Sequence, residues 1–137
     1  MAVILLLDDD EMLRGLLAEI LQEEGHTVIQ SENGFAAFDA TSMGKIDLMI
    51  TDLYMPRVDG LEAILNARKD RPDVPIIAMS AGGTYVKTDF LTETKKLGVR
   101  EVLHKPFHPK AFRETVRKVL ATYSAPARPQ RRRAQAS

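Results

Sequence analysis

The sequence contains no cysteine, which excludes disulfide bonds, thiolate zinc sites and a thiol nucleophile. No stretch approaches the roughly 18 apolar residues that a membrane-spanning helix requires. The start of the chain also lacks a basic region followed by an apolar stretch and a small-residue cleavage site, so it does not resemble a secretory signal. We therefore expect no membrane insertion and a cytoplasmic location.

The composition is that of one globular domain with a short basic tail. Of the 137 residues, 45% are hydrophobic and 28% are charged, which is ordinary for a folded protein with a buried core. The net charge of zero hides an asymmetry, because segment 124–137 holds four arginines and no acid. The remainder carries 15 Lys and Arg against 19 Asp and Glu, or about −4. We expect a folded domain over 2–123 and a disordered tail over 124–137.

Segments with the pattern of strands alternate along the chain with segments that have the periodicity of helices. The expected strands are 3–7, 27–30, 48–51, 76–79 and 101–103. The expected helices are 12–24, 35–43, 61–69, 86–97 and 110–123. Five successive strand–helix units predict an α/β fold, with a parallel sheet that is covered by helices on both faces.

Polar residues that can carry chemistry follow four of these strands. In open parallel sheets, ligands bind at the carboxyl ends of the strands, near the point where the strand order reverses. The residues at these ends are Asp8, Asp9 and Asp10 after the first strand, Asp52 after the third, Ser80 after the fourth and Lys105 after the fifth. Each has an ordinary structural explanation when taken alone, as a turn residue, a helix cap or a solvated lysine.

Together these residues supply the parts of a phosphoryl-transfer site. Clustered carboxylates are unfavourable without a cation, and oxygen ligands without cysteine or histidine favour Mg²⁺. Asp52 is then the candidate nucleophile, because a carboxylate can accept a phosphoryl group. Lys105 can pair with a carboxylate or a phosphate oxygen, and Ser80 can donate a hydrogen bond to the same group.

The stretches "LLLDDDEMLR", "DLMITDLYMPRVDG", "IIAMSA" and "VLHKPF" resemble the receiver domain of two-component response regulators, the CheY-like family. The resemblance covers about residues 2–123. It implies a flavodoxin-like (βα)5 fold, a doubly wound five-stranded parallel sheet with strand order 2-1-3-4-5.

The resemblance also implies a role for each site residue. Asp52 would be the phosphoacceptor, and Asp8 and Asp9 would be the acidic pair, with Asp9 the more direct magnesium ligand. The backbone carbonyl of Tyr54 would add a further ligand, so that the metal set is Asp8, Asp9, Asp52 and Tyr54.

The remaining implied roles concern the phosphoryl group and the ends of the elements. Ser80 would hydrogen-bond the phosphoryl group, and Lys105 would contact it by charge. The Lys105–Pro106 bond would be cis. Asp10 matches no family role, and we interpret it as the cap of the following helix.

Two features differ from the usual family pattern. Val102 stands three residues before Lys105, where many members carry a Tyr or Phe that turns inward on activation. His104 is a possible substitute, although a solvated or partly buried histidine is the simpler interpretation. The segment 80–98 is about three residues longer than in common members, which indicates a changed set of partners or a different way of transmitting the signal.

The resemblance predicts a single-domain response regulator and not a conventional enzyme. It would accept a phosphoryl group on Asp52 from a sensor histidine kinase or a histidine phosphotransfer protein. The signal would pass to a downstream protein through the face built from the fourth helix, fifth strand and fifth helix. We expect no binding to nucleic acid, since four tail arginines give only a weak electrostatic grip.

Three alternatives stay open from the sequence. One is a receiver-like interaction module that works without phosphorylation. The second is a magnesium-dependent phosphatase of the haloacid-dehalogenase type, which Tyr54 opposes because such sites place a second Asp at that position. The third is nucleic-acid binding through "RPQRRR".

Overall fold

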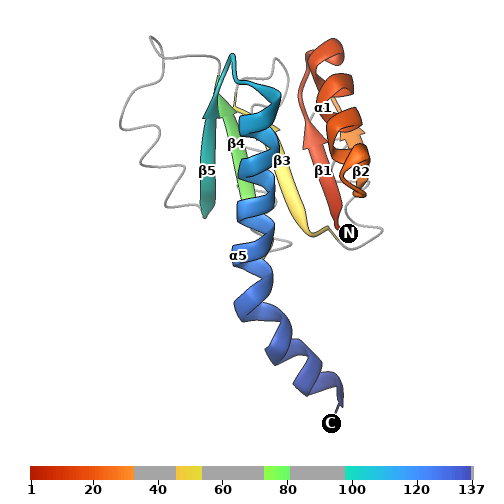
Figure 1. Ribbon diagram of the computed structural model, residues 1–137, viewed down its shortest axis with the longest axis vertical. Helices are drawn as coiled ribbons and strands as arrows, with labels where there is room; N and C mark the ends of the chain where they lie inside the picture. Colours follow the sequence, from red (N-terminus) through yellow and green to blue (C-terminus); the bar gives the residue numbers. More distant parts are fainter. Residues whose placement is uncertain (33–45, 54–72, 81–97, 137) are drawn as a thin grey trace.

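The computed structural model describes residues 1–32, 46–53, 73–80 and 98–136, and side chains as far as residue 122 (Figure 1). Its centre is a five-stranded parallel sheet in the order β2-β1-β3-β4-β5. The strands are β1 (Val3–Leu7), β2 (Thr27–Ser31), β3 (Leu48–Asp52), β4 (Ile76–Ser80) and β5 (Val99–His104). This order confirms the CheY-like, flavodoxin-like fold that the sequence predicts. The expected helices 35–43, 61–69 and 86–97 lie outside the described residues.

The central strands are buried on both faces because their sequences are almost entirely apolar. All five residues of β3 and all five of β4 are buried, as expected of strands inside a parallel α/β sheet. Successive side chains point to opposite faces, so β1 contributes Ile4 and Leu6 to one core and Leu5 and Leu7 to the other. The apolar run 3–7 thus serves both cores at once.

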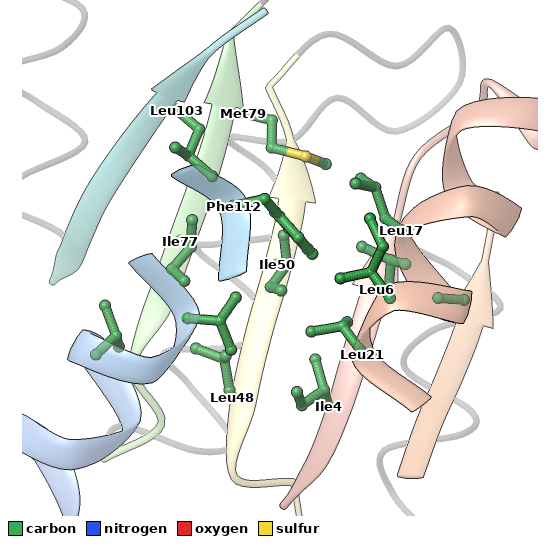
Figure 2. Close-up of a cluster of buried hydrophobic side chains, with 14 of the residues drawn as sticks. Ile4, Leu6, Leu17, Leu21, Leu48, Ile50, Ile77, Met79, Leu103 and Phe112 are labelled. Atoms are coloured by element: carbon green, nitrogen blue, oxygen red, sulfur yellow. The ribbon is translucent and has the colours of Figure 1, made fainter. Parts of the chain in front are cut away.

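The first core lies beneath the two described helices, α1 (Glu11–Glu23) and α5 (Pro109–Ala136). Both helices cover the same face of the sheet (Figure 1). Figure 2 shows Leu17 and Leu21 of α1 and Phe112 of α5 directed at the strand residues Ile50 and Leu6. Phe112 is fully buried, and this packing fixes how the two helices lie across the strands.

Helix α1 begins and ends where local chemistry dictates. The Asp10 carboxylate accepts a hydrogen bond from the Leu13 N–H at 3.1 Å, which satisfies one of the unpaired donors of the first turn. Gly25, just beyond the C-cap Glu24, has φ +92°, a conformation that glycine adopts without steric cost. Asp10 thus begins the helix, as the sequence predicts, and Gly25 follows its end.

The described elements depart from the predicted bounds mainly at the C-terminal end of the chain. Strand β5 begins at Val99, two residues before the predicted start. It includes polar residues because it lies at the edge of the sheet, where part of its side chains are exposed. Helix α5 is described as far as Ala136. The division of the chain into a folded domain over 2–123 and a disordered tail over 124–137 stays a prediction. The helix bends toward its end (Figure 1).

Neither described helix combines the length and the apolar character needed to cross a lipid bilayer.

Candidate functional site

The predicted site residues meet at one edge of the sheet because their strands are neighbours. Asp8 follows β1 directly, Asp52 is the last residue of β3, and the two strands pair with Leu7 opposite Thr51. Ser80 ends β4, and Lys105 follows β5. The structure therefore brings together side chains that lie far apart in the sequence.

Three carboxylates form a compact cluster at this edge. Asp8, Asp9 and Asp52 each offer an oxygen, and these oxygens lie within 4.8 Å of one another. Asp8 and Asp52 are buried, with 0% and 4% exposure, whereas Asp9 is exposed. The cluster thus has a buried floor of two carboxylates and one carboxylate at its open side.

Lys105 joins the two buried carboxylates. Its Nζ donates to Asp52 Oδ2 at 2.8 Å and to Asp8 Oδ2 at 3.1 Å. The lysine side chain is 20% exposed, so the ammonium sits at the boundary between the protein and solvent. Its backbone N–H donates to the Ser80 carbonyl at 2.7 Å, and the Lys105–Pro106 bond is cis, as expected. One cation therefore neutralises part of the charge of a pair that would otherwise repel.

The burial of the site shifts the pKa of two of its groups. Burial raises the pKa of the Asp8 carboxyl, since its effect exceeds that of the hydrogen bonds from the Asp10 N–H and Lys105, and the charge of Asp52 raises it further. For Lys105, burial acts to lower the pKa, but the hydrogen bonds and charges of Asp52 and Asp8 outweigh it, and the pKa is raised. The ammonium of Lys105 stays charged at neutral pH.

The third aspartate of the run has a structural role. The N–H of Asp10 donates to Asp8 Oδ1 at 2.9 Å, while the Asp10 side chain caps α1. The interpretation of Asp10 as a helix cap is therefore confirmed. Through its backbone N–H, the same residue also holds the Asp8 carboxylate in place.

Ser80 is fully buried, and its hydroxyl Oγ has no hydrogen-bond partner within the described parts of the chain. A buried, unpaired hydroxyl is costly. Its position at the end of β4, beside the end of β3 with Asp52, places it at the same end of the sheet as the acidic cluster. The Tyr54 carbonyl, expected as a metal ligand, lies outside the described residues.

The two unusual positions on β5 differ in exposure. Val102 is partly buried and packs against the second core, whereas His104 is exposed. The exposed position agrees with the interpretation of His104 as a solvated histidine, and its role as a substitute for the aromatic residue stays a prediction.

One contact of the site was not anticipated. Arg14 Nη1 donates to the backbone carbonyl of Asp8 at 2.7 Å, and Arg14 Nε to Gln30 Oε1 at 3.3 Å. Arg14 lies one helical turn after the cap Asp10, so its side chain can reach back over the turn. Nothing in the pattern of strand ends pointed to it.

The donor set of the cluster fits a magnesium ion. The available atoms are carboxylate oxygens, which are the hard ligands that Mg²⁺ prefers. Two of the carboxylates are buried and share a single ammonium, so a divalent cation would relieve the remaining negative charge. The open side at Asp9 leaves positions for water or a phosphate oxygen.

Comparison with known proteins identifies the same architecture elsewhere. Residues 4–117 match the family described as "Response regulator receiver domain". Sporulation initiation phosphotransferase F of Bacillus subtilis is 32% identical over 117 residues, which cover 85% of this chain and 92% of that protein. The DNA-binding transcriptional regulator NtrC of Azospirillum brasilense is 36% identical over 126 residues, but the match spans only 26% of its length.

One of the similar solved structures contains bound Mg²⁺ and BeF. The response regulator protein TrrA of Thermotoga maritima, in complex with Mg²⁺ and BeF, is 34% identical to this chain. The superposition covers 87% of this chain and 99% of TrrA, with a TM-score of 0.74.

Proposed function

This chain belongs to the response regulator receiver family, whose members are phosphoacceptor signalling proteins rather than conventional enzymes, and from that premise we propose that it accepts a phosphoryl group on Asp52. The observation that carries the proposal is the joint contact of Lys105 with Asp8 and Asp52 inside a cluster of three carboxylates. We assign the receiver to residues 2–123, which contain the family match.

In the proposed reaction, a carboxylate oxygen of Asp52 attacks the phosphorus of a phosphohistidine. The new O–P bond forms as the P–N bond breaks, and the electron pair of that bond stays on the histidine nitrogen, which takes up a proton. Lys105 holds the Asp52 carboxylate by a 2.8 Å hydrogen bond and is positioned to follow the charge onto the phosphoryl oxygens. The unpaired Ser80 hydroxyl supplies a further donor.

We assign Asp8, Asp9 and Asp52, together with the Tyr54 carbonyl, as magnesium ligands. Bound magnesium would neutralise charge on the transferred group. The TrrA complex with Mg²⁺ and BeF supports this assignment by similarity. Hydrolysis of the acyl phosphate by water would then return the Asp52 carboxylate and inorganic phosphate.

The proposed output is a change of protein contacts. The aspartyl phosphate adds charge and acceptor oxygens at the ends of β3 and β4. Ser80 and Lys105, whose backbones are joined by a 2.7 Å hydrogen bond, would respond together. We propose a sensor histidine kinase or histidine phosphotransfer protein as donor and a downstream protein as target, in the cytoplasm.

Intact-protein mass spectrometry after incubation with acetyl phosphate tests the proposal. We expect wild type to gain one phosphoryl group in the presence of Mg²⁺ and none after chelation. Asp52→Asn removes the nucleophile with little change of volume, and its spectrum should stay unchanged. Asp47→Asn is a matched control that alters a carboxylate at the opposite edge of the sheet, where Asp47 accepts from the Val3 N–H. A phosphoryl gain that persists in Asp52→Asn would contradict the proposal.

A further inference from the structure

Arg14 makes contacts that link the acidic turn to the neighbouring strand. It lies in the first turn of α1, half-buried, and its guanidinium reaches back over residues 8–10. Nη1 donates to the Asp8 carbonyl at 2.7 Å, and Nε donates to Gln30 Oε1 on β2 at 3.3 Å. A planar guanidinium can make two such bonds in fixed directions, which an ammonium cannot.

With the bond from Arg14, the backbone N–H, the carboxylate and the carbonyl of Asp8 each take part in a hydrogen bond. Its N–H donates to the Ser31 carbonyl at 3.1 Å, and its Oδ1 accepts from the Asp10 N–H at 2.9 Å. Arg14 holds the one remaining backbone atom of this residue, the carbonyl oxygen. The N–H of Arg14 also donates to the Asp10 carbonyl at 2.9 Å, so the turn is tied to the helix at both of its ends.

Asp9 lies between these fixed points. Within the described ranges, no hydrogen bond or ion pair holds its exposed side chain. The direction of the Asp9 carboxylate is therefore set by the backbone of the turn. The hydrogen bond from Arg14 to the Asp8 carbonyl therefore determines whether the carboxylates of Asp8 and Asp9 can reach the same cation.

The positive charge of Arg14 acts on magnesium affinity in the opposite direction to its hydrogen bonds. Its guanidinium forms no ion pair among the described residues, and a positive charge held next to the turn that carries Asp8 and Asp9 weakens the binding of a cation. A purely electrostatic role for Arg14 predicts that its removal tightens magnesium binding. A geometric role predicts that its removal weakens it.

We infer that Arg14 is a positioning residue for the magnesium site, which holds the turn 8–10 through the Asp8 carbonyl and Gln30 so that Asp8 and Asp9 face the same cation. The inference deepens the proposed function and rests on it, because it takes the acidic cluster as the magnesium site. Residues that orient metal ligands affect affinity strongly, by about 10-fold to 100-fold.

Magnesium titration followed by backbone amide NMR provides the test, with thermal unfolding by circular dichroism recorded beside it. We expect Arg14→Ala to weaken magnesium binding about tenfold, at the low end of that range because the loss of charge acts in the opposite direction. Arg14→Lys keeps the charge but not the two-point contact, and should weaken binding at least as much. Gln30→Ala removes only the anchor on β2 and should give a smaller loss.

Arg117→Ala is the matched control. Arg117 on α5 pairs with Glu24, the C-cap of α1, at 2.7 and 2.9 Å, so this variant removes one arginine that contacts the end of α1 remote from the acidic cluster. Its magnesium affinity should equal that of wild type.

Two results would overturn the inference while leaving the proposed function intact. One is tighter or unchanged magnesium binding by folded Arg14→Ala, and the other is full retention of affinity by Arg14→Lys. Absence of magnesium binding by wild type would instead overturn the proposed function itself. A lower melting temperature with unchanged affinity would show that Arg14 only stabilises the fold.

Discussion

Replacing Lys105 with methionine should make the acidic cluster destabilise the fold. In wild type the ammonium bonds both Asp8 Oδ2 and Asp52 Oδ2, and the two aspartate side chains are 0% and 6% exposed. Removing one partner of a buried ion pair costs about 3–5 kcal/mol, because it leaves an uncompensated charge. Since Lys105 itself is 20% exposed, we expect the lower end, a loss of about 3 kcal/mol in the free energy of unfolding.

The loss should depend on pH in a defined direction. The Asp8 pKa is already raised by burial, and Lys105 acts to lower it, so its removal raises the Asp8 pKa further. A carboxyl with a raised pKa in the folded state favours folding below its unfolded pKa, and this contribution is lost as the pH rises through the folded pKa. The deficit of Lys105→Met should therefore be largest at about pH 8 and shrink toward about pH 5.

Magnesium should reduce the same deficit. The variant keeps the three carboxylates and loses the competing ammonium, so it should bind the ion more tightly than wild type. A fivefold gain in affinity would recover about 1 kcal/mol when the ion is in excess.

Urea unfolding followed by circular dichroism measures these effects. Lys118→Met is the matched control, because the side chain of Lys118, which pairs with Glu101, is 67% exposed. It should change the free energy of unfolding by no more than about 0.5 kcal/mol. The reasoning is refuted if Lys105→Met costs no more than this control, or if its cost does not vary with pH and magnesium.

Three further predictions concern individual contacts. His26 accepts a hydrogen bond from the Ala2 N–H through Nδ1. Burial and the charge of the N-terminus lower the pKa of His26. The contribution of His26 to stability is therefore present above its unfolded pKa and is lost as the pH falls through the lowered folded pKa. Wild type should thus lose more stability between about pH 7.5 and 5.5 than His26→Gln in urea titrations. Ser80→Ala removes an unpaired buried hydroxyl and should raise the free energy of unfolding by about 1 kcal/mol, while the rate of phosphorylation by acetyl phosphate falls. Asp10→Ala removes the cap on the Leu13 N–H and should lower the free energy of unfolding by about 1 kcal/mol, with the phosphoryl gain retained.

Much of the fold follows from local patterns in the sequence. The apolar runs 3–7 and 48–51 predict strands buried on both faces, and β1 and β3 have that burial. Asp10 before an amphipathic segment predicts a helix start, and the cap is present. The meeting of Asp8, Asp52 and Lys105 follows from one topological rule, that parallel strands end at the same edge. The strand order itself came from the family resemblance.

Other features depend on tertiary structure that no local pattern encodes. The ammonium of Lys105 could have met a phosphate or solvent, and its bridge between two carboxylates, 97 and 53 residues away in the chain, appears only in three dimensions. The bond from Arg14 to the Asp8 carbonyl is likewise a backbone contact, which residue type does not announce.

The central proposal, that Asp52 carries the phosphoryl group, is tested most directly by chemical trapping. Borohydride reduces an aspartyl phosphate to homoserine, and peptide mass spectrometry locates the converted residue. After incubation with acetyl phosphate and Mg²⁺, we predict homoserine at position 52 and none at positions 8 and 9. Conversion of Asp8 or Asp9, or no conversion of Asp52 in a sample whose intact mass shows the phosphoryl gain, would contradict the proposal.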